Sequence, residues 1–139
     1  MAEFESVKTT NPTSEDFAWK YNGEAYTLRA GETKELAKPI AFLWAKHLAS
    51  KMIVDEARSK ATKKDFENPK SPIHVQVSQL SIYDTPERRI ALYKIFGDVQ
   101  TVQDAVLSFP FKGFIGEMSL YENFVKKESE SKEAEKLKT

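Results

Sequence analysis

Alternating apolar and polar residues near the start of the chain predict a β-hairpin. Phe17, Trp19 and Tyr21 alternate with Ala18 and Lys20, and a second run of the same kind covers residues 24–28. The intervening Asn-Gly pair tolerates the positive φ angles that a two-residue type I′ turn requires. This turn fixes the register, in which the facing pairs are Tyr21 with Glu24, Trp19 with Tyr26, and Phe17 with Leu28.

A long amphipathic helix follows the hairpin. A short third strand is expected over residues 33–36, and the helix is expected from Pro39, a residue suited to a first helical turn, to about Lys60. Apolar residues recur here at intervals of three and four positions, so we expect this helix to cover the aromatic face of the hairpin. The stripe consists of Ile40, Leu43, Trp44, His47, Leu48 and Met52.

The second half of the chain predicts smaller elements. Residues 61–72 read as a polar connection, and residues 73–77 alternate with period two, as in a short strand or an extended arm. A helix is expected to begin at Pro86 after an Asp84 or Thr85 cap and to stop at Gly97.

A further short helix is expected from Thr101, as its cap, to Leu107. The next eight residues, 109–116, combine bulky apolar side chains with one proline and two glycines, so they cannot form a regular element. We predict that this stretch is a protein-binding surface, because aromatic residues are enriched in the cores of interfaces. The predicted partner-binding residues are Phe109, Phe111, Phe114 and Ile115.

The expected architecture is one α+β domain over residues 16–125 with an extended segment at each end. Residues 1–15 lack periodicity and are expected to form a polar arm that a partner orders. Residues 126–139 contain five lysines and four glutamates, and are expected to be frayed helix or disordered.

Composition narrows the classes of function. The 139 residues contain 21 Lys and Arg and 21 Asp and Glu, and this balance argues against a protein that coats nucleic acid or an anionic membrane. Because cysteine is absent, disulfides and thiolate chemistry are excluded. The acidic start does not read as a signal peptide, and no apolar run is long enough to span a bilayer.

Few residues suggest catalysis. His47 lies on the apolar stripe and is expected to be a partly buried structural residue; neither it nor His74 belongs to a metal-binding motif. Glu24, Glu32 and Glu35 would form an acid–base pair only if the fold brought two of them together. We therefore predict no catalytic, cofactor-binding or metal-binding residues and no enzymatic activity.

One stretch of sequence resembles a known group of proteins. The block from Trp19 to Glu32, with its Ala-Gly-Glu turn, precedes Pro39 and a helix that contains Ala-Lys-His-Leu-Ala. This combination is similar to small proteins encoded in the structural-gene regions of tailed bacteriophages, over about residues 17–53. The resemblance implies a virion component of the head, neck or tail, and no functional residue can be transferred from it.

Three functional hypotheses remain open from the sequence. The first is a structural or assembly protein of a phage particle, assembled in the host cytoplasm, whose partners are other structural proteins or copies of itself. The second is a single-stranded nucleic-acid-binding module that stacks bases on the hairpin aromatics, although nucleic acid is not the expected partner. The third is a cytoplasmic adaptor protein, and none of the three involves a membrane.

Overall fold

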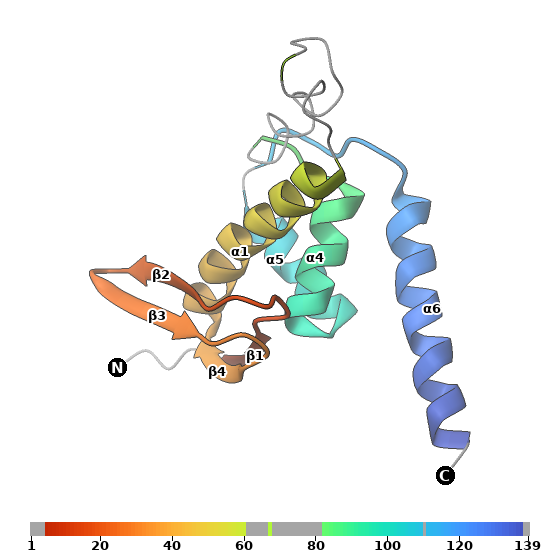
Figure 1. Ribbon diagram of the computed structural model, residues 1–139, viewed down its shortest axis with the longest axis horizontal. Helices are drawn as coiled ribbons and strands as arrows, with labels where there is room; N and C mark the ends of the chain where they lie inside the picture. Colours follow the sequence, from red (N-terminus) through yellow and green to blue (C-terminus); the bar gives the residue numbers. More distant parts are fainter. Residues whose placement is uncertain (1–4, 61–66, 68–81, 110, 138–139) are drawn as a thin grey trace.

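The computed structural model describes residues 5–60, 67, 82–109 and 111–137. Along this part of the chain the strands come first and the helices follow, so the fold is α+β, as predicted (Figure 1). The elements are β1 (Ser6–Thr10), β2 (Phe17–Tyr21), β3 (Glu24–Leu28), β4 (Thr33–Ala37), α1 (Lys38–Lys60), α4 (Pro86–Phe96), α5 (Val99–Ser108) and α6 (Met118–Leu137).

The predicted hairpin is confirmed, including its register. Strands β2 and β3 pair antiparallel, with Trp19 opposite Tyr26 and Tyr21 opposite Glu24. The turn residues Asn22 and Gly23 have φ angles of 50° and 84°, as a type I′ turn requires. The local sequence was sufficient here because a two-residue turn leaves only one register.

The predicted third strand forms, but it does not extend the hairpin. Strand β4 pairs antiparallel with β1, so the strands make two separate two-stranded sheets, β1–β4 and β2–β3. The prediction that residues 1–15 form an arm ordered by a partner is therefore wrong from Ser6 onward, because β4 of the same chain orders these residues.

A buried polar residue fixes the chain after β1. Asn11 has no exposed surface, and its side-chain amide donates hydrogen bonds to the carbonyl oxygens of Glu15 and Leu28, at 2.8 and 3.0 Å. Its side-chain oxygen accepts a bond from the Thr13 backbone N–H at 3.0 Å. Buried polar groups satisfied in this way stabilise a fold without apolar periodicity, which is why the polar sequence suggested an arm.

Helix α1 covers the aromatic face of the hairpin, as predicted. Trp44 is 1% exposed, its indole N–H donates to the Tyr26 carbonyl oxygen at 3.1 Å, and its ring meets Phe17 edge-on at 5.3 Å. The cover is incomplete, because Trp19 remains 40% exposed.

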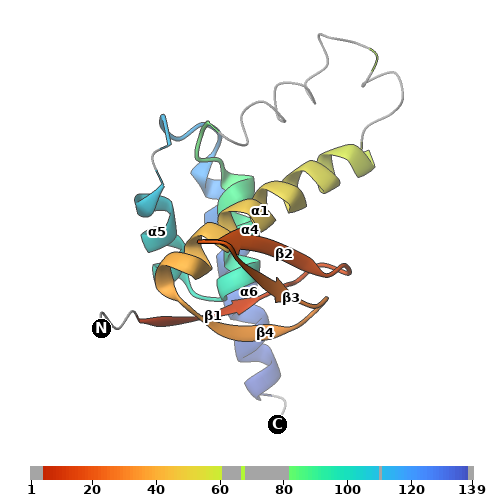
Figure 2. The same cartoon turned by 90° about the vertical axis from the view of Figure 1, so that its left-hand side faces the viewer.

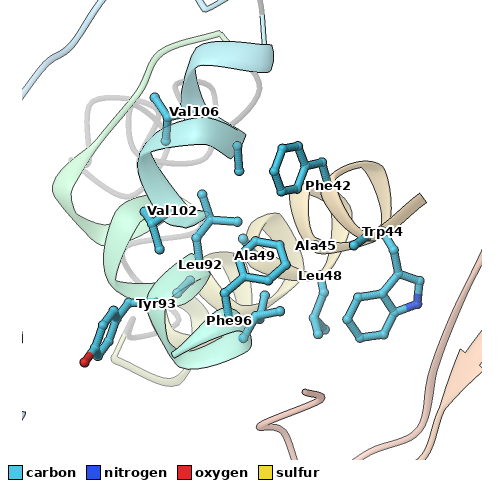
Figure 3. Close-up of a cluster of buried hydrophobic side chains, with 14 of the residues drawn as sticks. Phe42, Trp44, Ala45, Leu48, Ala49, Leu92, Tyr93, Phe96, Val102 and Val106 are labelled. Atoms are coloured by element: carbon cyan, nitrogen blue, oxygen red, sulfur yellow. The ribbon is translucent and has the colours of Figure 1, made fainter. Parts of the chain in front are cut away.

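The other side of α1 builds the main core with α4 and α5. Figure 3 shows Phe42 on the side of α1 nearest α5 and Trp44 on the opposite side. The ring of Phe42 meets that of Phe96 in α4 edge-on at 5.8 Å. Leu92 and Val102 are fully buried. Helix α1 is therefore the central element, buried against the hairpin on one side and against α4 on the other, and α5 packs in turn on α4 (Figure 2).

The predicted ends of α4 are confirmed, and the predicted cap of α5 is wrong. The Thr85 hydroxyl accepts the backbone N–H of Arg88, and Gly97 ends α4 with a φ of 70°. Helix α5 is capped by Asp98 rather than by Thr101, whose backbone N–H donates to the Asp98 carboxylate at 3.0 Å. Both residues are good caps, and the earlier one begins the helix.

The C-terminal residues belong to a long helix, which agrees with the helical one of the two alternatives expected for residues 126–139. Helix α6 runs to Leu137 and packs on α4 through Tyr121, which is buried, and Phe124, whose ring meets Tyr93 edge-on at 6.1 Å. Its distal half continues past α4 (Figure 1).

Among the described helices, none is long and apolar enough to cross a membrane. The element predicted over residues 73–77 lies outside the described residues.

Candidate functional site

The predicted contact surface is an irregular segment with a fixed backbone. Residues 109–116, here called the phenylalanine segment, join α5 to α6; residue 110 is outside the described part. The segment lies beside the residues that precede α4, because Asp84 donates its backbone N–H to Gly113 at 2.8 Å and accepts that of Ile115 at 3.0 Å. A further bond joins the N–H of Lys112 to the Ile82 carbonyl oxygen at 2.9 Å. The fold thus holds this segment in one place without a regular element.

The structure brings two of the four predicted partner-binding residues together. Phe109 and Phe111 are half-buried and meet edge-on at 5.5 Å. Phe114 is 38% exposed and its ring lies 5.4 Å from the guanidinium carbon of Arg89, whereas Ile115 is half-buried. The segment therefore combines partial packing on the core with apolar surface that reaches solvent.

Two cations outside the predicted partner-binding residues lie against the same rings. The guanidinium carbon of Arg88 lies over the Phe111 ring, 4.9 Å from its centroid, and the ammonium of Lys46 lies 5.8 Å from that centroid. Lys46 is also 5.1 Å from the centre of Phe109. Such cation–π contacts are attractive, but they leave the N–H donors without hydrogen-bond acceptors.

The burial of Arg88 is unusual for a charged residue. It has no exposed surface, and none of its three guanidinium nitrogens has a hydrogen-bond partner in the part of the chain that the structure describes. Burial lowers the pKa of Arg88 to about 10, although the nearby carboxylate of Asp84 acts in the opposite direction. Buried arginines are normally paired, because desolvating an unpaired charge is costly.

The neighbouring arginine shows the usual arrangement. Nε of Arg89 donates to both carboxylate oxygens of Asp84, at 3.1 and 2.9 Å, and Nη2 makes a further contact with that carboxylate. Asp84 is thus bonded to Arg89, and no ion pair to Lys46 or Arg88 is found among the described residues. Two adjacent arginines therefore have opposite electrostatic environments.

An open groove borders the phenylalanine segment at Phe109. Its volume is about 670 Å³, and apolar side chains from the start of α1 form much of its wall. The lining residues are Glu5, Lys38, Pro39, Phe42, Leu43, Ser108 and Phe109. Lys38 is engaged, at 3.6 Å from Glu5 and 3.9 Å from Asp104. Phe109 thus lines the groove and also contacts Lys46.

The hairpin aromatics are turned toward α1, which weakens the nucleic-acid hypothesis. The ring of Trp19 stacks on His47 at 3.6 Å, so one face of this exposed indole is already occupied. His47 is half-buried, as expected, and burial followed by the charges of Lys46 and Arg88 lowers its pKa below the ordinary value of 6.5. Its described contacts are those of a packed structural side chain.

The three candidate glutamates have different surroundings and do not form a carboxylate pair in the described structure. Glu24 accepts from the Tyr26 hydroxyl at 3.2 Å, whereas Glu32 accepts the Arg29 backbone N–H at 2.9 Å. Glu35 lies on the other sheet, in β4. Within residues 5–60, 67, 82–109 and 111–137, no group of three or more His, Asp or Glu side chains could hold a metal ion. His74 is outside these ranges.

The sequence contains one weak signal for the buried arginine. Arg88 and Arg89 stand in the first turn of α4, where the helix dipole favours acidic side chains. The sequence does not show which arginine is buried without a partner, because Asp84, Lys46 and Phe111 come from three separate parts of the chain.

Comparisons with protein-family models, with curated protein sequences and with solved structures find no match to this chain.

Proposed function

We propose that this chain is a non-enzymatic assembly protein that binds other proteins through the phenylalanine segment. The observation that carries the proposal is the aromatic surface itself, in which Phe109 borders an apolar groove and Phe114 is exposed. Aromatic side chains on a fixed backbone supply contact area while losing little conformational entropy on binding.

The proposed assembly is a bacteriophage particle. This part of the proposal rests on the resemblance of residues 17–53, an aromatic hairpin followed by a helix, to proteins from phage structural-gene regions. The distal half of α6 adds support, since a long polar helix that extends past the body offers a second surface to a neighbouring subunit.

A photo-crosslinking experiment tests the proposal. A benzoylphenylalanine at position 114 should form crosslinks to a structural protein or to a second copy of the chain, and the crosslinked peptides are identified by mass spectrometry. The same probe at Ala18, an exposed hairpin position, is the matched control. Equal crosslinking from both positions, or none from position 114, would refute binding through the phenylalanine segment.

The virion hypothesis has its own test. Purified particles should contain the chain in a fixed ratio to the other structural proteins, as measured by quantitative mass spectrometry. Absence from the particles would remove the phage part of the proposal. A crosslink to a single enzyme without a larger assembly would favour the adaptor hypothesis instead.

A further inference from the structure

The unpaired guanidinium of Arg88 is the strongest indication of a ligand in the described structure. The residue has no exposed surface, and its three guanidinium nitrogens have no hydrogen-bond partners within residues 5–60, 67, 82–109 and 111–137. Arginine is suited to buried sites because its planar fork binds carboxylate or phosphate oxygens in pairs. Here that capacity is unused.

Internal stabilisation does not account for this arrangement. The carboxylate of Asp84 is occupied by Arg89, which bonds to both of its oxygens. Arg88 also lies in the first turn of α4, where the positive end of the helix dipole disfavours a further cation. Its contact with the Phe111 ring covers one face of the guanidinium, and the N–H groups in its plane are buried without acceptors among the described residues.

Lys46 adds a second charge to the same place. Its ammonium is 5.8 Å from the centre of Phe111 and 5.1 Å from the centre of Phe109, and it has no acidic partner among the described residues. Phe109 also lines the open apolar groove of about 670 Å³, so Lys46 lies next to one wall of the groove, although neither Lys46 nor Arg88 is a lining residue. An occupant that matches this surface carries an anionic group beside an apolar one.

We propose that Arg88 and Lys46 bind the carboxylate of an acidic residue on a partner protein, with an adjacent apolar side chain of that partner in the groove beside Phe109. The inference rests on the proposed function and identifies the chemistry of the partner. A carboxylate is favoured over free phosphate because a peptide supplies the charge and the apolar group together. The partner enters from the side of Lys46 and Phe111, which are half-buried, and displaces the Phe111 ring from Arg88.

The test uses the full chain and a defined probe. An acetylated and amidated Glu-Leu-Glu-Leu-Glu peptide is titrated into the protein labelled with ¹⁵N, and the Nε–Hε signal of Arg88 is followed by NMR. The same peptide with glutamine in place of glutamate is the uncharged control. Inorganic phosphate is titrated separately to identify a free-anion site.

The expected result is binding of the glutamate peptide with a shift of the Arg88 signal. Removing one member of a buried charge pair should weaken binding about 30-fold or more in Arg88→Met, with a smaller loss in Lys46→Met. Lys94→Met is the matched control, because Lys94 also lies over a ring, 5.6 Å from the centre of Phe124, in the last turn of the helix that begins beside Arg88. This control should bind like the unmodified chain.

Three results would overturn the inference: no binding of the glutamate peptide, equal binding of the glutamine peptide, or binding that Arg88→Met leaves unchanged. Binding of phosphate at Arg88 without binding of the peptide would also reject the carboxylate assignment. If Phe114 crosslinks persist in Arg88→Met, the proposed function stands and the carboxylate site fails. If the peptide binds but no protein crosslinks form, the proposed function fails.

Discussion

Replacing each of the two adjacent arginines by methionine should change stability in opposite directions. Arg88→Met removes a buried cation that has no hydrogen-bond partner among the described residues, so we expect the free energy of unfolding to rise. Arg89→Met removes the partner of Asp84, so we expect it to fall. Methionine keeps a similar length and apolar stem in both cases, which makes the two variants mutual controls.

The size of the Arg88 effect follows from its environment. Burial lowers the pKa of Arg88 from 12.5 to about 10. At about 1.4 kcal/mol per pKa unit, folding disfavours the charged form by about 3 kcal/mol relative to the neutral one. The lost cation–π contact with Phe111 offsets about 1–2 kcal/mol of this. The net gain is therefore about 1–2 kcal/mol.

The Arg89 effect is larger and has the opposite sign. The Asp84 side chain is only 6% exposed, so Arg89→Met leaves a buried carboxylate without its bidentate partner. Breaking a buried pair in this way costs about 3–5 kcal/mol. The two variants should therefore differ by about 4–7 kcal/mol.

Chemical denaturation followed by far-UV circular dichroism measures both values, and thermal unfolding gives a second reading. For a chain of this size, Arg88→Met should raise the melting temperature by about 3–8 °C, and Arg89→Met should lower it by more than 10 °C. A loss of stability in Arg88→Met comparable to that in Arg89→Met would refute the reasoning, because it would mean that Arg88 is compensated within the fold.

Four further predictions concern the rest of the fold. Trp44→Ala should destabilise the protein by about 3–5 kcal/mol in urea unfolding, and Trp19→Ala by about 2 kcal/mol, because 40% of Trp19 is exposed; equal losses would contradict the packing. NMR titration should give His47 a pKa below 6.5, so folding disfavours its protonated form and stability should fall as pH drops through 6.5 toward 5; a folded pKa above 6.5 would reverse this trend. Gly23→Val should destabilise the hairpin, because φ is 84° at this position and a β-branched residue disfavours a positive φ, although valine is well suited to a β-strand. An unchanged melting temperature would refute this prediction. Tyr121→Phe should be neutral or slightly stabilising in thermal unfolding, because its buried hydroxyl has no hydrogen-bond partner in the described part of the chain. A loss of more than about 1 kcal/mol would contradict this, because it would mean that the hydroxyl makes a hydrogen bond.

Local chemistry made much of the fold predictable. The Asn-Gly turn, helix α1 and the Thr85 and Gly97 ends of α4 depend on residues close together in the sequence, and the structure confirms all of them. The predicted apolar stripe of α1 is confirmed in part, because Trp44 and Leu48 are buried whereas its other four residues are half-buried. The pairing of β4 was not predictable in the same way. Its partner is β1, more than twenty residues earlier, and Asn11 fixes that connection through hydrogen bonds that leave no periodic signal.

The candidate site was predictable only in its apolar part. Phe109 and Phe111 stood out because bulky side chains interrupted by proline and glycine are costly to leave in water. The charged part depends on which side chain is buried and which is paired, and these are properties of tertiary packing. Sequence distance hides the cluster, since Lys46 and Phe111 are 65 positions apart, although both contribute to it.

The pairing of β1 with β4 has a practical consequence for expression. A truncation that removes the polar start of the chain up to Thr10 would leave all five residues of β4 without their hydrogen-bonding partners. An unpaired strand edge is a template for intermolecular pairing, so the shortened chain would tend to self-associate through non-native sheets. Preparations intended for interaction studies should therefore retain this first strand, since aggregation through β4 would imitate genuine assembly.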